Sequence, residues 1–261
     1  MNDQATSGSL AGTARIALAC LDLTSLNDGD TEADIEQLCR RATGAFGRTA
    51  AVCVWPRFAA FARARLPASV AVAAVANFPH GHTDIPKAVV DTAAIVAAGA
   101  QEVDVVLPYR ALMAGDEQIC VDLLAAVRAA CPGLRLKVIL ETGELRDDAL
   151  IQRAAALALA AGADFLKTST GKTATSATPA AARLLLEAIA ADPGARGHVG
   201  FKPAGGIRTV ADAAIYIGLL REIIGDEAVT PARFRIGASG LLNDIEAVLG
   251  GGAAPPGTAT Y

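Results

Sequence analysis

The chain has 261 residues, of which 52% are hydrophobic and 4% aromatic, and its formal net charge is −4. This length suits one α/β barrel or two small domains, and the longest apolar runs fall short of the roughly 20 residues that a membrane-spanning helix needs. Because no run of Lys and Arg offers a surface for nucleic acid or an anionic membrane, we expect a small-molecule partner, no nucleic acid and no membrane.

The cysteines predict a reducing environment. There are five of them, an odd number, and no C-x-x-C pair occurs, a pattern typical of free thiols rather than of a disulfide framework or a zinc site. The apolar stretch 16–21 after the polar opening is too short for the core of a signal peptide. We therefore expect a cytoplasmic protein.

Strand-like and helical patterns alternate along the whole chain. The expected strands are Ile16–Leu21, Thr49–Trp55, Val70–Ala76, Glu102–Leu107, Leu134–Leu140, Asp164–Thr168, His198–Lys202 and Arg233–Gly237. The expected helices are Thr31–Arg41, Phe58–Arg65, Asp84–Ala98, Gln118–Ala130, Asp147–Ala161, Pro179–Ala191, Val210–Ile224 and Leu241–Leu249.

Eight βα units in this order predict a single-domain (β/α)8 TIM barrel, because strict alternation implies parallel strands joined by crossover helices. The first strand is not followed by G-x-G-x-x-G, which argues against a dinucleotide-binding sheet. We expect an N-terminal extension over 1–15, the barrel over 16–250 and a flexible C-terminal tail over 251–261.

Polar residues mark the strand faces that point into the barrel, since side chains alternate along a strand. The sets that share a face are Glu102 with Asp104, Arg135 with Lys137, Ile139 and Glu141, Phe165 with Lys167 and Ser169, and His198 with Gly200 and Lys202. Three lysines and Asp104 should thus converge on one interior.

Lys167 lies inside an apolar strand, and this position requires a structural or functional explanation because an unpaired buried ammonium costs several kcal/mol. One interpretation is a buried ion-pair network that fills the interior, but three ammoniums against one clear mid-strand carboxylate are a poor balance. The other is a nucleophilic amine: desolvation and a neighbouring cation both lower an amine's pKa. Lys167 beside Lys202 has this arrangement.

Glycines in the late loops favour a phosphate site, which barrels often form after strands seven and eight. Gly205 and Gly206 follow the seventh expected strand, and Gly237 to Gly240 end the eighth. Gly171 and Lys172 after the sixth could add an ammonium. Each glycine pair alone could be ordinary turn punctuation.

Taken together, these residues resemble the class I deoxyribose-phosphate aldolase family. The resemblance covers nearly everything except the two tails, through the motifs LDLTSLN (21–27), TAAVCVWPRF (49–58), NFPHG (77–81), EVDVVLPYRALMAG (102–115), KVILETGEL (137–145), DFLKTSTGK (164–172), GFKPAGGIR (200–208) and RIGASG (235–240).

This resemblance implies reversible cleavage of 2-deoxy-D-ribose 5-phosphate into D-glyceraldehyde 3-phosphate and acetaldehyde, without a metal or another cofactor. It implies that Lys167 forms the Schiff base, that Lys202 lowers the pKa of Lys167, and that Asp104 with Lys202 positions water and shuttles protons. A tail tyrosine, here Tyr261, would assist proton transfer.

The resemblance also implies a set of substrate contacts. Interior polar groups would be oriented by Asp22, Thr24, Asn27 and Lys137, whereas Cys53 would form a pocket wall. The phosphate and substrate would be held by Thr170, Gly171, Lys172, Gly205, Gly206, Gly237, Ser239 and Gly240. Gly240 departs from the family, where a second serine is expected, so phosphate affinity should be lower.

Rival functions remain open. His80, His82 and His198 could bind a metal ion, although His198 is expected at the opposite end of the barrel. Another phosphosugar barrel enzyme, such as a transaldolase, or a sugar-phosphate-binding barrel without activity would share parts of the site. The sequence leaves the assembly open, with a homodimer as one hypothesis.

Overall fold

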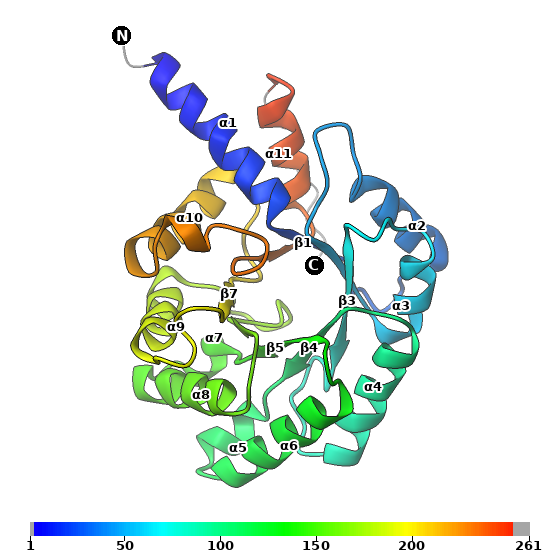
Figure 1. Ribbon diagram of the computed structural model, residues 1–261, viewed down its shortest axis with the longest axis vertical. Coiled ribbons are helices and arrows are strands. Elements are labelled where there is room, and N and C mark those ends of the chain that lie inside the picture. Colours follow the sequence, from blue (N-terminus) through cyan, green and yellow to red (C-terminus); the bar gives the residue numbers. More distant parts are fainter. Residues whose placement is uncertain (1–2, 253–261) are drawn as a thin grey trace.

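Eight parallel strands form the centre of the molecule (Figure 1), as predicted for a (β/α)8 barrel. This computed structural model describes residues 3–252, with side chains described from Leu10 onward. The strands are β1 Leu21–Thr24, β2 Ala51–Val54, β3 Ala71–Ala76, β4 Glu102–Val106, β5 Arg135–Ile139, β6 Phe165–Lys167, β7 Gly200–Lys202 and β8 Ile236–Ala238.

The strand order closes the sheet into a barrel. It runs β7-β6-β5-β4-β3-β2-β1-β8, and parallel bridges from Phe201 to Phe234 and from Ala204 to Gly237 join the two ends. All carboxyl ends of the strands therefore meet at one mouth of the barrel, where the loops before the helices can build a site.

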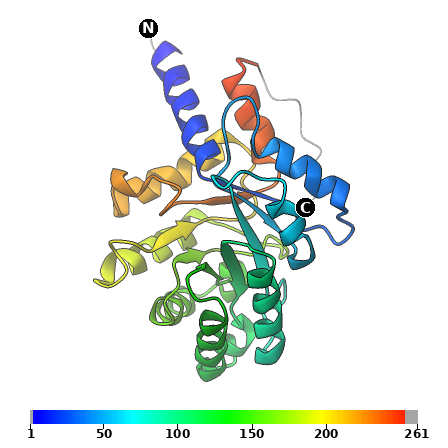
Figure 2. The same cartoon turned by 45° about the vertical axis from the view of Figure 1, so that its right-hand side comes forward.

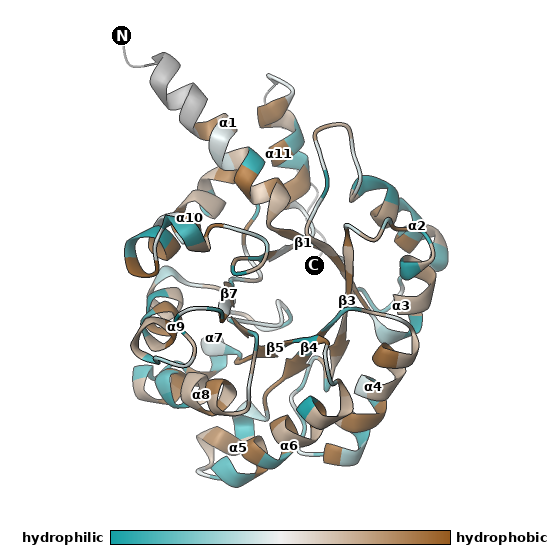
Figure 3. Ribbon diagram, viewed as in Figure 1, coloured by the Kyte–Doolittle hydropathy of each residue, from teal (hydrophilic) through white to brown (hydrophobic). Residues whose placement is uncertain are grey.

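Helices surround the strands on the outside (Figures 1 and 2). They are α1 Asp3–Ala19, α2 Glu32–Arg41, α3 Pro56–Arg63, α4 Ile85–Ala97, α5 Tyr109–Met113, α6 Glu117–Ala130, α7 Thr142–Leu145, α8 Asp148–Ala160, α9 Pro179–Ala191, α10 Val210–Ile223 and α11 Leu241–Leu249, with a 3-10 turn at Asp226–Ala228. The strands are mostly hydrophobic, and hydrophilic residues gather on the outer helices (Figure 3).

Short polar side chains fix where several of these helices begin. In each case an N-cap oxygen accepts a hydrogen bond from the backbone N–H three residues later, which satisfies a donor that the first helical turn leaves unpaired. The N-cap residues that do so are Thr31, Asp84, Asp116, Asp147, Thr178 and Thr209.

The expected first strand, Ile16–Leu21, is wrong, since residues up to Ala19 belong to helix α1 and β1 begins only at Leu21. Ala14, Ala17 and Leu18 are buried at helical spacing, and alanine has the highest helix propensity. Helix α1 starts within the predicted extension and packs beside α11 and α10. The periodicity of buried alanines outweighs the short apolar run that suggested a strand.

The other strands overlap their expected ranges and are shorter, and β8 starts three residues later than expected and ends one residue beyond Gly237. His198 precedes β7, and Arg233 and Arg235 precede β8. Short helices α5 and α7, which the sequence analysis did not predict, follow β4 and β5 directly. They lie between strand and main helix, at the carboxyl mouth of the barrel.

Candidate active site

Three lysines from three strands converge on Asp104 in the barrel interior, as the strand phases predicted. Asp104 Oδ1 lies 2.8 Å from Lys137 Nζ, while Oδ2 accepts from Lys167 Nζ at 2.8 Å and from Lys202 Nζ at 2.7 Å. All four side chains are buried. The amine of Lys167 thus shares a single carboxylate oxygen with a second ammonium.

A second layer of charge lies toward the amino ends of the strands. Asp22 pairs with Lys202 at 2.5 Å and with Arg235 at 2.7 Å, and Glu102 pairs with Lys137 at 2.5 Å and with Arg235 at 2.7 Å. The expected balance of three ammoniums against one carboxylate is therefore wrong, because Asp22 and Glu102 add two more buried anions.

Glu102 and Arg235 belong to this layer although the sequence patterns did not predict them as site residues. Glu102 was recognised as in phase with Asp104, which was the available signal. Arg235 lay in an expected strand, two residues before Gly237, and the alternation of side chains would have pointed it inward. Each makes two or more buried ion pairs.

These contacts separate the pKa values of the lysines. Burial alone would lower the pKa of Lys202, but Asp104 and Asp22 raise it above the usual lysine value. Burial likewise lowers the pKa of Lys167, and Lys202 lowers it further, so that its pair with Asp104 does not restore the ordinary value. Burial and the neighbouring Lys202 cation thus both act on the Lys167 pKa in the predicted direction.

Asp104 stays ionised despite its burial. Desolvation would raise its pKa, but Lys137, Lys167 and Lys202 hold it well below the usual range. Its negative charge is divided among three cations, so Lys167 receives only part of it. Repulsion from the Lys202 ammonium on the same carboxylate opposes protonation of Lys167 and partly offsets the attraction of Asp104.

The wall of the interior at β2 and β3 is apolar. Cys53, Ala73 and Val75 form a small cluster with Leu26, and Trp55 packs against it. Cys53 Sγ lies 3.9 Å from Asp104 Oδ2, and burial, followed by the nearby Asp104 charge, raises the pKa of the thiol. The position of Cys53 suits a neutral pocket wall.

Two predicted residues, Thr24 at the end of β1 and Asn27 in the loop after it, form hydrogen bonds with groups near them in the chain. Thr24 Oγ1 donates to Asp22 O at 2.8 Å, whereas Asn27 is exposed and its Nδ2 donates to Asp30 Oδ1 at 3.0 Å. Trp55 Nε1 donates to Asn27 O at 3.1 Å. Asn27 thereby fixes the loop at the mouth to the apolar wall.

The loops after β6 and β7 pack tightly against each other. Gly205 has φ +81°, and a Cβ there would lie 2.5 Å from Ser176 Oγ and 3.1 Å from Gly171 Cα. Only glycine tolerates both this backbone conformation and this approach. Gly171 and Gly206 also have positive φ. The expected meeting of these glycine-rich loops at one mouth is confirmed.

Glycine is required at position 237 by the packing of the Lys202 side chain, which the sequence pattern did not predict. A Cβ at this position would lie 3.1 Å from Lys202 Cε and 2.9 Å from Ala204 Cβ, so glycine leaves room for the Lys202 side chain. The Gly237 N–H donates to Pro203 O at 2.9 Å. Ser239 and Gly240 follow at the start of α11, where Gly240 is the N-cap and makes no side-chain cap.

Glu141 supports the loop after β6. It adopts the left-handed conformation, with φ 58°, and accepts from Thr170 Oγ1 at 2.5 Å and from Thr173 Oγ1 at 3.2 Å. Lys172 N–H in turn donates to Thr170 Oγ1 at 3.0 Å. This chain of hydrogen bonds orders the segment that carries Thr170, Gly171 and Lys172.

Ser169 lies in phase with Lys167 beyond the end of β6. Its hydroxyl is buried and has no hydrogen-bond partner among the described residues. A buried hydroxyl without a partner is costly, and it therefore suggests a group that binds a ligand. Tyr261, the remaining predicted residue, lies outside the described residues.

The three histidines do not gather. His80 and His82 are neighbours in the loop after β3, with ring centroids 5.4 Å apart, but His198 precedes β7 at the opposite end of the barrel. Within residues 3–252, no group of three or more His, Cys, Asp or Glu side chains is arranged to hold a metal ion.

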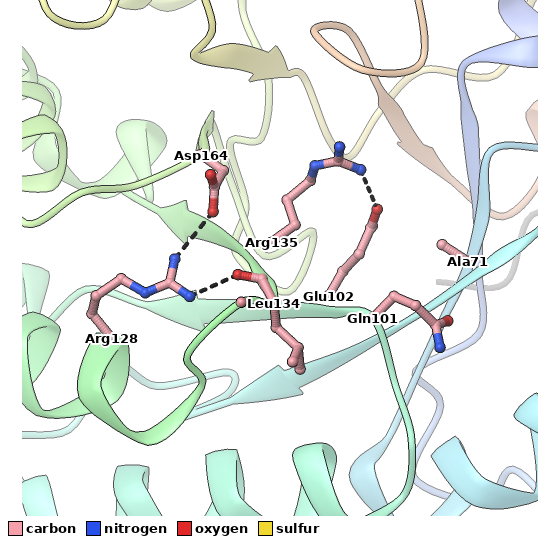
Figure 4. Close-up of a pocket in the computed structure, with 8 residues that line it drawn as sticks. Ala71, Gln101, Glu102, Arg128, Leu134, Arg135 and Asp164 are labelled. Carbon is pink, nitrogen blue, oxygen red and sulfur yellow. Dashed lines mark hydrogen bonds and ion pairs between the residues drawn. The ribbon is translucent and has the colours of Figure 1, made fainter.

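A hollow of about 550 Å³ opens at the amino ends of the strands (Figure 4). Arg135 and Glu102 face each other across it, with a hydrogen bond of 2.9 Å, and Arg128 binds Asp164 at its edge. The hollow lies at the mouth formed by the amino ends of the strands, opposite the mouth formed by their carboxyl ends. Glu102 lines the hollow and also pairs with Lys137 and Arg235 in the interior.

Fold and site define a (β/α)8 barrel with a buried amine next to a fully engaged carboxylate, an arrangement suited to covalent catalysis at a carbonyl carbon. A family model for DeoC/LacD family aldolases matches residues 16–245. The chain belongs to this family of aldolases and is an enzyme of the lyase class.

Individual relatives agree with this assignment. The chain is 50% identical over 242 residues to a deoxyribose-phosphate aldolase of Agrobacterium fabrum, covering 92% of each chain. A crystal structure of a candidate deoxyribose-phosphate aldolase from Toxoplasma gondii is similar at TM-score 0.85 and 26% identity, over 94% of this chain and 97% of the other. One from Coccidioides immitis gives TM-score 0.77 at 26% identity, over 93% and 97%.

Proposed function

We propose that this chain catalyses the reversible cleavage of 2-deoxy-D-ribose 5-phosphate into D-glyceraldehyde 3-phosphate and acetaldehyde. The observation that carries the proposal is the buried Lys167 amine, which shares Asp104 Oδ2 with the ammonium of Lys202. An amine with a lowered pKa attacks an aldehyde readily. The Agrobacterium fabrum relative, at 50% identity, supports the choice of substrate.

The chemistry follows from that amine. Lys167 Nζ adds to the C1 aldehyde of the open-chain sugar, and loss of water from the carbinolamine gives a protonated imine. The imine nitrogen accepts the electron pair of the C2–C3 bond as the C3 hydroxyl loses its proton, which releases D-glyceraldehyde 3-phosphate. Protonation of the enamine at C2 and hydrolysis then free acetaldehyde and the amine.

Asp104 and Lys202 are proposed to move the protons in these steps. Asp104 Oδ2 lies 2.8 Å from Lys167 Nζ, and Lys202 Nζ lies 2.7 Å from the same oxygen. Both distances are within the range required for proton transfer. The unpartnered Ser169 hydroxyl is a candidate donor to a substrate oxygen. Asp22, Thr24, Lys137 and Asn27 would hold this arrangement, and the apolar wall around Cys53 would face the hydrocarbon part of the aldehyde.

The phosphate is proposed to bind between the loops after β6, β7 and β8. Support comes from the contact of Gly205 with the Gly171 loop and from the start of α11 at Ser239 and Gly240, where the helix leaves backbone donors for an anion. Gly206, Thr170 and Lys172 lie on the same loops, and Gly237 lies in β8 just before the last of them. Gly240 offers no hydroxyl, so binding there would use its N–H.

Cleavage of 2-deoxy-D-ribose 5-phosphate, followed through reduction of the released aldehyde, tests this function. We expect turnover by the unmodified protein, loss of turnover in Lys167→Ala, and normal turnover in Lys87→Ala, which changes an exposed lysine on α4. Cleavage of fructose 1,6-bisphosphate or transfer of a three-carbon unit, with no action on the deoxy sugar, would contradict the proposal.

Two further expectations belong to this proposal. No helix within residues 3–252 is both long and apolar enough to cross a membrane, and we propose that the enzyme works in the cytoplasm on small phosphosugars and aldehydes. A homodimer is our proposal for the assembly. Light scattering on the purified chain would decide it, since a monomer or a tetramer would contradict it.

A further inference from the structure

A chain of ion pairs connects Lys167 with the opposite mouth of the barrel. From Asp104 it passes to Lys137, whose Nζ also lies 2.5 Å from Glu102 Oε2. Glu102 then binds Arg235, with Nη2 2.7 Å from Oε1. Along this path each group is within direct contact of the next.

A second branch leads to the same arginine. Lys202 binds Asp22 Oδ2 at 2.5 Å, and Asp22 Oδ1 accepts from Arg235 Nη1 at 2.7 Å. Arg235 is 3% exposed and Glu102 1%. Lys202 is therefore linked to the buried Arg235 guanidinium through Asp22, and Lys137 is linked to it through both Glu102 and Asp22, whose Oδ2 lies 3.3 Å from Lys137 Nζ.

Within the ion-pair network below Lys167, the buried anions and cations are equal in number when Lys167 is neutral. Glu141 is also buried, but it lies outside this network and accepts hydrogen bonds from Thr170. Asp22, Glu102 and Asp104 supply three anions, and Lys137, Lys202 and Arg235 supply three cations. Protonation of Lys167 would add a fourth cation to a network with three anions, in a setting where unpaired ions are costly. Each pair below Asp104 thus influences the charge that Lys167 can carry.

We propose that Glu102 and Arg235 are positioning residues for the reaction proposed above, which act through Lys137, Asp22 and Lys202 to fix the charge balance around Lys167. Neither touches the reacting nitrogen. Glu102 lies two residues before Asp104 on β4, about 7 Å along the strand, close enough for a charge to act across a water-poor interior.

The direction of the effect follows from the sign of each charge. Loss of the Glu102 anion makes protonation of Lys167 harder, whereas loss of the Arg235 cation makes it easier. The titratable and charged groups around Lys167 in this reasoning are Asp22 on β1, Cys53 on β2, Glu102 and Asp104 on β4, Lys137 on β5, Glu141 after β5, Lys202 on β7 and Arg235 before β8. All except Glu102 and Arg235 remain in both variants.

The test compares the pH dependence of kcat/KM for cleavage of 2-deoxy-D-ribose 5-phosphate in Glu102→Gln, Arg235→Met and the double variant. We expect the acidic limb of the profile to move down by about one pH unit in Glu102→Gln and up by about one in Arg235→Met. In the double variant, which restores the balance of charges, the acidic limb should lie close to its pH in the unmodified protein. This variant also keeps the test decisive if one of the single variants fails to fold.

Two controls separate charge from shape. Arg235→Lys keeps the cation and should leave the limb near its original pH. Arg135 also binds Glu102, but its side chain is 36% exposed beside the hollow of Figure 4, so Arg135→Met should shift the limb by much less than Arg235→Met because solvent screens its charge.

Opposite shifts that cancel in the double variant would establish the proposal. Equal losses of kcat/KM at every pH, or shifts of the same sign in both single variants, would overturn it. If the unmodified protein did not cleave the deoxy sugar at all, the proposed function would fail first, so the two failures are distinguishable.

Discussion

Replacing Lys202 by leucine should raise the pKa of Lys167. In the native site Lys167 Nζ and Lys202 Nζ contact Asp104 Oδ2 at 2.8 Å and 2.7 Å, which places the two nitrogens about 4–5 Å apart by ordinary hydrogen-bond geometry. Leucine removes the neighbouring cation and leaves this oxygen to Lys167 alone. Both changes favour the protonated, unreactive amine.

The size of the shift can be worked from this geometry. Two unit charges about 4 Å apart at an effective dielectric constant near 20 interact by about 4 kcal/mol, equivalent to about 3 pKa units. Relaxation around the leucine reduces this, so we expect the acidic limb of kcat/KM to rise by about 2 pH units. At neutral pH the rate should fall by about 100-fold.

The assay is the pH profile of kcat/KM for cleavage, with circular dichroism to establish that the variant is folded. Lys202→Arg is the matched control. It keeps a cation at the position, so the acidic limb of its kcat/KM profile should lie closer to that of the unmodified protein. A Lys202→Leu profile whose acidic limb stays at the original pH would refute the reasoning, even if the rate were lower throughout.

Three further predictions concern the rest of the site. Gly240→Ser adds the hydroxyl that the phosphate loop lacks and should lower the KM for the phosphorylated sugar a few-fold with little change in kcat; an unchanged KM would place the phosphate elsewhere. Removal of Tyr261 should slow proton exchange on acetaldehyde more than it weakens binding, as followed by NMR in deuterium oxide, and equal exchange rates would make the tail inert. Excess chelator should leave the rate of cleavage unchanged, whereas inhibition reversed by a divalent cation would support the rival metal mechanism at His80 and His82.

Much of the fold could be predicted from the sequence because each strand has a distinct apolar run and each helix a clear period. The exception is the N-terminus, where IALACL reads equally well as a strand. Ala14 and Ala17 pack on a helical face instead. A run of alanines carries little information about the packing surface it will meet.

The upper layer of the site could also be predicted, since Asp104, Lys137, Lys167 and Lys202 lie in phase on neighbouring strands. The lower layer could not, because the register between β1, β4 and β8 decides whether Arg235 reaches Asp22 and Glu102. Strand register around a closed barrel depends on pairings far apart in the chain. The role of Gly237 is similar, because it depends on the path of the Lys202 side chain.

The central claim is that the Lys167 amine is the nucleophile, and reductive trapping tests it most directly. Acetaldehyde and borohydride are added together, and the modified peptide is mapped by mass spectrometry. We predict an ethyl group on Lys167 in the peptide around DFLKTSTGK. In Lys202→Leu, trapping should require a more alkaline solution than in the unmodified protein. An ethyl group on Lys137, Lys172 or Lys202 instead, or no adduct on a protein that cleaves the sugar, would contradict the account.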